Sequence, residues 1–592
     1  MPHLPLPTFF DPDRAGCIAA SRPELDTIAA DFAEKHRVPA LAYGIVAGDT
    51  LVHSGATGWA DLAAAQKASA TTLFRIASMT KSFAALAVLQ LRDAGALALD
   101  DCAADYVPEL ASLVSLAADA PAITLRHLLT MSAGWPEDNA WGDRQLALDD
   151  VAFSALLARG VPFASVPGTQ YEYSNLGYMV LGRIASRVAG MPFQQYVTER
   201  ILAPLGMLQT CWNLDDMTAA PVARGYDDID GAWVEEPLAW MRSAGDTAAF
   251  GGLYTTVQDL ARWVALFLSA WPPRAGDEPA VLRRASLREM QQAATARPPW
   301  LSGSALGEQV SPESGSYGFG LFAGYVAGLG RIVQHAGGLP GFGSHMAWLP
   351  DRDLGVIAFA NRTYAPAVPI ALQLLRRVVA HAGVSERRIH PAPALTAARE
   401  GATRLLQHWD DALADALVAD NFFLDLPRER WQQRVVRLHA LHGDLAPDGE
   451  IEIDNPLRCG WKLRGERGWC MVFLTLAPTM PPRIQEIEVE SVLPPNASMQ
   501  AALDGLLALI AAPTLRGVAR LFAPKTDRAA MRDRLQLVQL SIGSCALEAI
   551  TGGNGNTQTV ARLAGTKGKL IATVTLDRPG GKIRTAEFRT IK

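Results

Sequence analysis

Residues 73–97 read LFRIASMTKSFAALAVLQLRDAGAL, and this stretch decides the fold more than any other. From Ser78 onward it is apolar on nearly every side for several turns, which is typical of a helix buried in a core. Ser78 and Lys81 lie one turn apart at the start of this helix, so their side chains share one face. A lysine can accept the proton of a serine hydroxyl, and a helix N-terminus favours a developing oxyanion. The spacing therefore predicts a nucleophilic serine. An N-capping serine beside a solvated lysine is the alternative.

A second pattern, YEYSN at 171–175, precedes the helical stretch NLGYMVLGRIASRVAG. Tyr173 and Asn175 flank the turn before this helix, so a phenol and an amide can point into one cavity. A nearby lysine ammonium can lower the pKa of a phenol, and we expect this effect to let Tyr173 serve as a general base. A tyrosine that only packs at a helix start is the alternative.

The third pattern, QHAGGLPGFG at 334–343, combines a histidine with a run of glycines. Glycine in a strand edge allows a substrate backbone to approach closely, and the N–H of Gly338 could donate to an oxyanion. His335 could bind substrate or move protons. A simple loop with a structural histidine is the alternative.

The three patterns, in this order and at these separations, resemble the motifs of the serine β-lactamase and penicillin-binding-protein-like superfamily. The resemblance is strongest to the branch that holds class C β-lactamases, D-Ala-D-Ala carboxypeptidases, D-aminopeptidases and family VIII esterases. Two further stretches support it: ITLRHLLTMSAGW (123–135) and GGLYTTVQDLARW (251–263). It covers about residues 20–385.

The resemblance implies a role for each motif residue. Ser78 would be the nucleophile that forms an acyl-enzyme, and Lys81 and Tyr173 would share the proton transfers. Asn175 would orient the substrate or the lysine. Which of Lys81 and Tyr173 takes the first proton stays open, because their protonations are coupled.

The third motif of the family is Lys-Thr-Gly or His-x-Gly, and here it is His335-Ala336-Gly337. The resemblance implies that the N–H groups of Ser78 and Gly338 form the oxyanion hole. Histidine is mostly neutral at pH 7, so such a site selects less strongly for a substrate carboxylate than a lysine would.

We therefore expect a serine hydrolase that cleaves amide or peptide bonds, including those of D-amino acids, or ester bonds. A carboxylesterase or a β-lactamase of the same mechanism is the alternative within enzymes. A non-catalytic binding or sensor protein on the same scaffold is the alternative outside them. The substrate would be a small molecule or a peptide, and no cofactor or metal is implied.

The expected fold class is mixed α/β (α+β). A β-lactamase-like catalytic domain spans 1–385, with an antiparallel sheet flanked by helices and a helical subdomain that meets the sheet at the serine. A linker at 386–397 carries charge and two prolines. Two small α+β modules follow, at 398–491 and 492–592.

Local patterns predict individual elements of the first domain. Ser21 with Glu24 reads as a capping box at a helix start. Strands are expected at 40–48 and 50–58. Further helices are expected at 123–132, 175–189, 193–202 and 256–269.

The last 200 residues or so contain an internal repeat at an offset of about 100. The stretch GERGWCMVFLTLAPTMPPRIQEIEV (465–489) can be laid on GTKGKLIATVTLDRPGGKIRTAEF (565–588), glycine on glycine. Each repeat reads as one or two helices followed by about four strands. Small β-barrels are the competing interpretation.

Composition excludes several classes of function. A net charge of -6 over 592 residues gives no footprint for nucleic acid or for an anionic membrane. The six cysteines form no CxxC pair, and His439 and His442 lack ligand partners at metal spacing. The first residues, MPHLPLPTFFDPDRAG, lack a basic and then apolar signal pattern, so we expect a cytoplasmic protein. A homo-oligomer is compatible with all of this.

Overall fold

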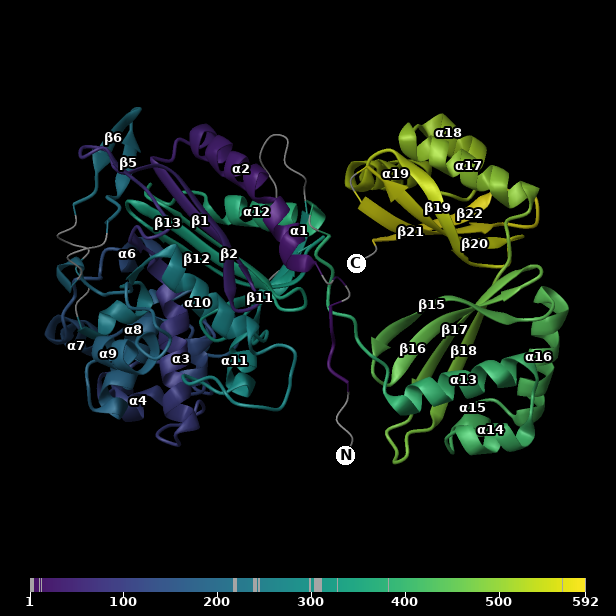
Figure 1. Cartoon of the computed structure of the whole chain (residues 1–592), viewed down its shortest axis with the longest axis horizontal. Helices are drawn as coiled ribbons and strands as arrows, with labels where there is room; N and C mark the ends of the chain where they lie inside the picture. The colour runs from purple at the N-terminus through teal and green to yellow at the C-terminus, as the bar shows by residue number, and fades with distance from the viewer. Residues whose placement is uncertain are drawn as a thin grey trace. The chain divides into compact units, whose positions relative to one another are not determined.

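A computed structural model describes residues 5–9, 11, 13–216, 221–237, 242, 245–297, 300–302, 311–326, 328–381, 383–566 and 568–590. The chain divides into two units, of which the larger spans Phe9–Arg387. The other holds Arg388–Lys592 together with the segment that ends at Thr8, and Thr8 pairs with Arg388. Figure 1 shows the helices and strands of both units.

The larger unit is built on one antiparallel sheet. Within the described residues this sheet has ten strands in the order β3-β2-β1-β14-β13-β12-β11-β10-β8, with β9 paired to β10. Their bounds are β1 Ala40–Ala47, β2 Thr50–Asp61, β3 Gln66–Lys67, β8 Thr295–Ala296, β9 Trp300–Ser302, β10 Ser311–Tyr317, β11 Phe322–Val326, β12 Gly330–Leu339, β13 Phe342–Leu349 and β14 Leu354–Ala360.

Both faces of this sheet are covered, so its central strands are apolar without interruption, as LGVIAFA in β14 shows. Alternate residues of β14 enter different cores: Val356 and Ala358 join one, and Ile357 and Phe359 join the other. On the first face, helices α2 (Arg22–Lys35) and α12 (Ala367–His381) pack on the sheet.

The second face carries the helical part of the unit (Figure 1). There α10 lies on β1 and β14, and α3 packs against α8. Besides α2 and α12, the larger unit contains, within the described residues, α1 Arg14–Ala20, which packs in the first core, and α3 Thr80–Asp93, α4 Ala103–Tyr106, α5 Leu125–Leu129, α6 Asn139–Gly142, α7 Asp150–Ala158, α8 Asn175–Ala189, α9 Phe193–Val197, α10 Val257–Leu268 and α11 Arg284–Met290. Two short antiparallel pairs complete the unit: β4 Phe74–Arg75 with β7 Tyr254–Thr255, which are distant in sequence, and the hairpin of β5 Tyr226–Ile229 with β6 Ala232–Glu235.

The smaller unit contains two four-stranded antiparallel sheets, each with its own helices and its own core (Figure 1). The α+β interpretation is therefore confirmed over the small β-barrels. The first set is α13 Pro393–Gln407, α14 Asp411–Leu417, α15 Phe422–Asp425, α16 Arg428–His442, β15 Ala446–Asn455, β16 Arg458–Gly465, β17 Gly468–Leu476 and β18 Ile484–Val492. The second is α17 Ala497–Ala511, α18 Leu515–Leu521, α19 Arg528–Ile542, β19 Cys545–Gly552, β20 Gln558–Gly565, β21 Gly568–Leu576 and β22 Ile583–Thr590.

The sequence repeat coincides with a repeat of register. Gly465 pairs with Gly468 across one hairpin, and Gly565 pairs with Gly568 across the other. In each set the third strand shifts register just before its last leucine. The division into modules at 398–491 and 492–592 stays a prediction.

The capping box predicted at Ser21 is wrong. Helix α1 precedes α2 almost without a break, so Ser21 has helical dihedral angles and its hydroxyl donates back to Ile18 O at 2.7 Å. Its side chain makes no capping hydrogen bond to α2.

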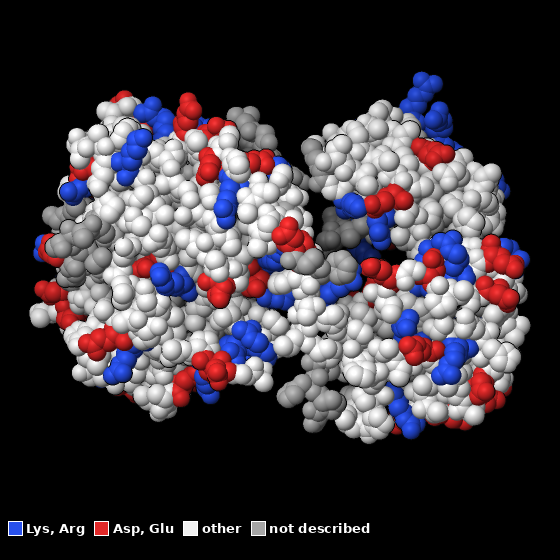
Figure 2. Space-filling view, viewed as in Figure 1, with Lys and Arg blue, Asp and Glu red and all other residues white. Residues whose placement is uncertain are grey.

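Charges are mixed over the surface. On the face drawn in Figure 2, basic and acidic side chains are interspersed on both units. Among the described helices, none has the length and apolar content needed to cross a bilayer.

Candidate active site

Ser78 lies in a tight turn that precedes α3. The turn is a 3-10 helix, Ala77–Met79, and Ala77 has a φ of 50°, which L-residues seldom adopt. The turn is anchored at Ile76, whose N–H donates to Leu253 O at 3.1 Å and whose carbonyl accepts from Ser344 Oγ at 2.9 Å. These contacts fix Ser78 between the sheet and the helical layer.

Lys81 is fully buried below Ser78, and its Nζ contacts three oxygens. They are Ser78 Oγ at 3.0 Å, Asn175 Oδ1 at 2.6 Å and Phe250 O at 2.9 Å. Burial lowers the pKa of Lys81 to about 7, against the opposing attraction of Asp143. Near neutral pH a large fraction of Lys81 is therefore a neutral amine.

The geometry around Lys81 Nζ decides where the lone pair of that amine points. The carbonyl oxygens of Asn175 and Phe250 can only accept hydrogen bonds, so they hold the two N–H bonds of the neutral amine. The remaining direction faces Ser78 Oγ. Neutral Lys81 can therefore accept the Ser78 proton, and charged Lys81 can donate to the same oxygen.

Asn175 is held in this orientation by its neighbours. Its Nδ2 donates to Asn139 Oδ1 at 3.3 Å, which leaves Oδ1 for Lys81. Asp138 accepts from the N–H groups of Asn175 and Leu176 at 2.6 and 2.8 Å, so a carboxylate caps the start of α8.

Tyr173 also contacts Ser78, but it is a neutral phenol and not the base of lowered pKa expected from the sequence. Its hydroxyl hydrogen-bonds to Ser78, and Lys81 Nζ lies 4.8 Å from its ring centroid. Burial raises the pKa of Tyr173 well above its ordinary value, more than the hydrogen bond to Ser78 lowers it. The expected lowering of this pKa is therefore wrong, because the cost of burying a phenolate outweighs any stabilisation by its neighbours.

His335 lies beside the two tyrosine rings with both nitrogens engaged. Nδ1 is 2.6 Å from Ala336 O, and Nε2 is 3.0 Å from the hydroxyl of Tyr317. A carbonyl can only accept, so Nδ1 carries the proton and Nε2 accepts from Tyr317. Burial and the charge of Lys81 lower the pKa of His335 to about 3. The side chain is thus a neutral ring.

Gly337 allows β12 to pass close to the serine turn. A Cβ atom at this position would overlap Ile76 O and Ser344 Oγ. Only glycine therefore lets the strand approach the turn that carries Ser78.

The strand register places the N–H of Gly338 at an open edge. A two-residue turn joins β12 to β13, so Leu339 and Phe342 form the first hydrogen-bonded pair. Because hydrogen-bonded and non-hydrogen-bonded pairs alternate, Gly338 directs its N–H away from β13. On that side β11 extends only as far as Gln334. The N–H is therefore available to a substrate oxygen.

Two carboxylates near Lys81, the buried Asp143 and the partly buried Asp138, were missed in the sequence. Asp138 and Asp143 belong to PEDNAWGD (136–143), which has no pattern that points to a pocket. Burial raises the pKa of Asp138, and it raises that of Asp143 to about 6. The hydroxyl of Tyr364 donates to Asp143 at 2.8 Å.

The ring nitrogens of His439 and His442 contact neighbouring residues of the smaller unit. His442 has its ring nitrogens 3.2 Å from Arg467 O and 3.1 Å from Ser491 Oγ. His439 Nε2 is 3.1 Å from Leu406 O. Over the described part of the chain, no three His, Cys, Asp or Glu side chains are grouped so that they could hold a metal ion.

The structure thus brings Ser78, Lys81, Tyr173 and Asn175 together, with β12 alongside. The family model described as Beta-lactamase matches residues 25–380. Protein flp of Staphylococcus aureus (strain MW2) is 27% identical over 365 residues, which are 61% of this chain and 67% of that protein. A beta-lactamase of Escherichia coli (strain K12) is 28% identical over 367 residues, covering 58% of this chain and 89% of its own length.

Among solved structures, the octameric penicillin-binding protein homologue from Pyrococcus abyssi is similar over 96% of this chain and 98% of its own. The TM-score is 0.51 and the sequence identity 16%, so this likeness concerns the fold.

Proposed function

The chain belongs to the beta-lactamase family, and on this premise we propose that it is a serine hydrolase that acts through an acyl-enzyme on Ser78. One observation carries the proposal. Lys81 Nζ is 3.0 Å from Ser78 Oγ, and two carbonyl acceptors fix its other hydrogen-bond directions. A buried amine with a pKa of about 7 in this position is a general base that is ready at neutral pH.

In the first step Ser78 Oγ attacks the substrate carbonyl and its proton moves to Lys81 Nζ. The carbonyl oxygen becomes an oxyanion, and we assign its stabilisation to the N–H groups of Ser78 and Gly338. Gly337 sets the distance between these two donors, because it lets β12 approach the serine turn.

The proton must then reach the leaving group. Tyr173 stays a neutral phenol and hydrogen-bonds to Ser78, so we assign it to this relay rather than to the role of a phenolate base. Collapse of the intermediate expels the leaving group and leaves the acyl-enzyme. Water then attacks the acyl carbon, and its proton is passed through Tyr173 and Lys81 to Ser78 Oγ, which leaves as the acyl–oxygen bond breaks.

The charge of the site favours a substrate with an amino group. Asp138 and Asp143 lie near Lys81, whose charge is only partly present at neutral pH, and His335 is neutral. Arg297 brings a positive charge over the ring of Tyr171, but around Lys81 the two carboxylates outnumber the partly charged amine. That part of the site attracts an ammonium group and repels a carboxylate. We therefore place amides and peptides with a free amino group first, including those of D-amino acids, and esters second.

The test compares three substrates: D-alanine p-nitroanilide, its N-acetyl derivative and p-nitrophenyl butyrate. We expect hydrolysis of the free amine to exceed that of the acetylated amide by about tenfold, since one ionic contact is lost. Asp143→Asn should reduce this ratio, and Ser78→Ala should abolish all three activities.

The other outcomes point to other functions. Ester hydrolysis alone, lost in Ser78→Ala, would indicate a carboxylesterase. Release of a single equivalent of product would indicate a binding or sensor protein that is acylated and stops. Activity that survives in Ser78→Ala would overturn the mechanism.

We also propose that the protein forms a homo-oligomer through its smaller unit. The Pyrococcus abyssi neighbour, described as octameric, is similar over both units. Helix α19 exposes Leu537 and Leu540, which are 65% and 62% accessible and lie one turn apart. Light scattering on the full chain should show an assembly that Leu537→Lys with Leu540→Lys dissociates, and a monomeric wild type would contradict this. Cytoplasmic location stays a prediction for cell fractionation.

A further inference from the structure

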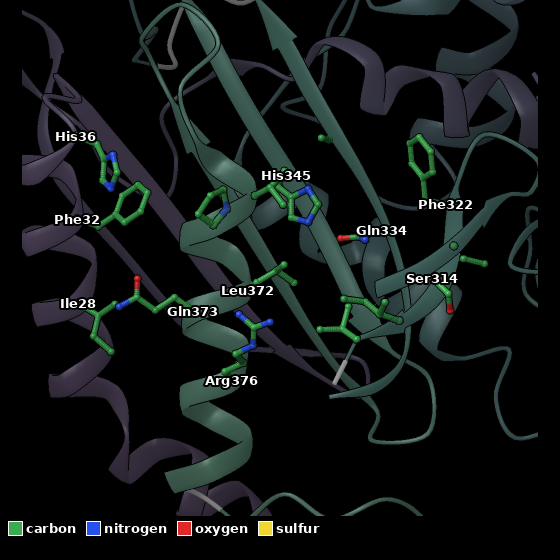
Figure 3. Close-up of a pocket in the computed structure, with 18 of the residues that line it drawn as sticks. Ile28, Phe32, His36, Ser314, Phe322, Gln334, His345, Leu372, Gln373 and Arg376 are labelled. Carbon is green, nitrogen blue, oxygen red and sulfur yellow. The ribbon is translucent and has the colours of Figure 1, made fainter. Parts of the chain in front are cut away.

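A large cavity lies on the face of the main sheet opposite Ser78. It has a volume of about 740 Å³, is open to solvent and is lined by residues of α2, α12 and strands β10 to β13. Figure 3 shows Ile28 and Phe32 reaching it from α2, and Leu372 and Arg376 from α12. The volume is in the range of cavities that hold small organic ligands.

Successive side chains of β12 and of β13 point to opposite faces of the sheet, and this separates the cavity from the catalytic site. On β13, Ser344 points to the serine turn, and the next residue, His345, lines the cavity. On β12, His335 faces Tyr173 and Tyr317, and its neighbour Gln334 lines the cavity. One pair of strands therefore forms a wall of both sites.

Buried polar atoms without partners lie in the wall of the cavity. His345 is 1% exposed, and within the described residues neither ring nitrogen has a hydrogen-bond partner. The Oε1 atom of Gln334 is also buried and without a partner there. Such groups are costly to leave unsatisfied, and native proteins rarely do so.

These free atoms have a definite hydrogen-bonding character. Burial lowers the pKa of His345 to about 3, so its ring offers one N–H donor and one acceptor nitrogen. Gln334 Oε1 accepts only. Gln334 pairs with Ala347 and His345 pairs with Ala336, so the two side chains are diagonal neighbours on one face of the sheet.

The rest of the lining combines apolar walls with charged groups, of which Lys35, Arg297 and Arg376 are basic and Asp31 is acidic. Phe32, Phe322 and Leu372 provide apolar walls. Lys35 and Arg376 are exposed at the rim, and they make no ion pair within the described residues. This combination suits a ligand with an apolar body and an anionic end.

We propose that this cavity is a second ligand site, which takes an N-acylated amino acid: an apolar acyl chain, a secondary amide and a carboxylate. The amide N–H donates to Gln334 Oε1, and the amide carbonyl accepts from His345. The acyl chain lies against Phe32 and Phe322, and the carboxylate meets Arg376. The proposal is independent of the hydrolase mechanism, because none of these residues takes part in the proton transfers. Phe322 also packs against the ring of His335.

The test uses the full chain with Ser78→Ala, so that no probe is turned over. Three probes are titrated by calorimetry: N-octanoylglycine, its methyl ester and decanoate. N-octanoylglycine should bind about tenfold more tightly than the ester, which lacks the charge, and than decanoate, which leaves the two polar groups unpaired.

Two variants assign these differences to residues. Arg376→Gln should remove the difference between acid and ester, and His345→Phe should remove that between N-octanoylglycine and decanoate. Arg200→Gln, an exposed site on the same unit, is the control and should change neither. Arg376 is exposed, so its variant remains informative if His345→Phe does not fold. Equal affinity for the three probes, or an acid–ester difference that persists in the Arg376 variant, would overturn the proposal.

Discussion

His335 on β12 and His345 on β13 are both buried and neutral, yet they lie on opposite faces of one sheet. His335 has both nitrogens hydrogen-bonded and belongs to a packed group of aromatic rings beside Lys81. His345 has neither nitrogen paired within the described residues and lines an open cavity. The comparison teaches that burial alone does not define a site. The serine face is preorganised by contacts already made, and the other face keeps space and unpaired atoms.

The largest effect is expected from removing the proton acceptor of Ser78. Lys81→Ala removes the amine that accepts the Ser78 proton, and we expect kcat/KM to fall about 10³-fold or more. Lys67→Ala, on an exposed edge strand of the same sheet, is the control and should leave kcat/KM unchanged. A fall of less than tenfold for Lys81→Ala would assign the base role elsewhere.

A change in β12 should have the next largest effect. A methyl group in Gly337→Ala overlaps Ile76 O and Ser344 Oγ, so the strand and the serine turn must separate. Loss of one oxyanion donor costs about 10²-fold in kcat, and we expect a loss of that order. Gly177→Ala, where a Cβ has only ordinary contacts, should be silent. Equal kcat for the two variants would contradict the oxyanion assignment.

The pH profile should report Lys81 and not His335. The pKa of Lys81 is lowered to about 7, so the active neutral amine predominates above that pH. Below it, kcat/KM should fall about tenfold for each pH unit. Asp143→Asn removes a negative charge that stabilises the charged form of Lys81. The acidic limb of the kcat/KM profile should therefore move to lower pH. His335→Asn should leave the apparent pKa of the acidic limb unchanged. A shifted pKa in this variant would mean that His335 titrates during catalysis.

The smallest effect compares the two histidines directly. His335→Phe removes the side-chain donor of the Ala336 carbonyl and one of the two partners of the Tyr317 hydroxyl, which also hydrogen-bonds to Tyr178. We expect a cost of about 1–3 kcal/mol in unfolding free energy. His345→Phe removes unpaired nitrogens next to free space, so its cost should be below about 1 kcal/mol. Pulse proteolysis in urea, with fragments of Phe9–Arg387 followed by mass, separates this unit from the other. Equal costs would mean that His345 has partners in solution.

Sequence patterns predicted much of the arrangement around Ser78, because that arrangement depends on residues close together in the chain. The separation of Ser78 from Lys81 along one helix and the turn before Asn175 are local geometry. So are the strands and the repeat glycines of the smaller unit. Helix α12 was not predicted, although Ile370, Ala371, Leu374 and Leu375 recur at helical spacing.

The electrostatics and the cavity could not be predicted in the same way. The pKa of Tyr173 depends on how deeply the folded chain buries it, and the neighbourhood of Asp143 depends on long-range packing. His345 reads in sequence as one more residue of an apolar strand. Only the folded sheet shows that it faces a cavity and that its partners are missing within the described residues.

The central claim is that Ser78 forms an acyl-enzyme with the help of Lys81. Intact-protein mass spectrometry during turnover of D-alanine p-nitroanilide or p-nitrophenyl butyrate tests it most directly. We predict one added acyl group, located by peptide mapping on Ser78 and absent in Ser78→Ala. Turnover at the wild-type rate in Ser78→Ala, or an acyl group mapped to another residue, would contradict the account.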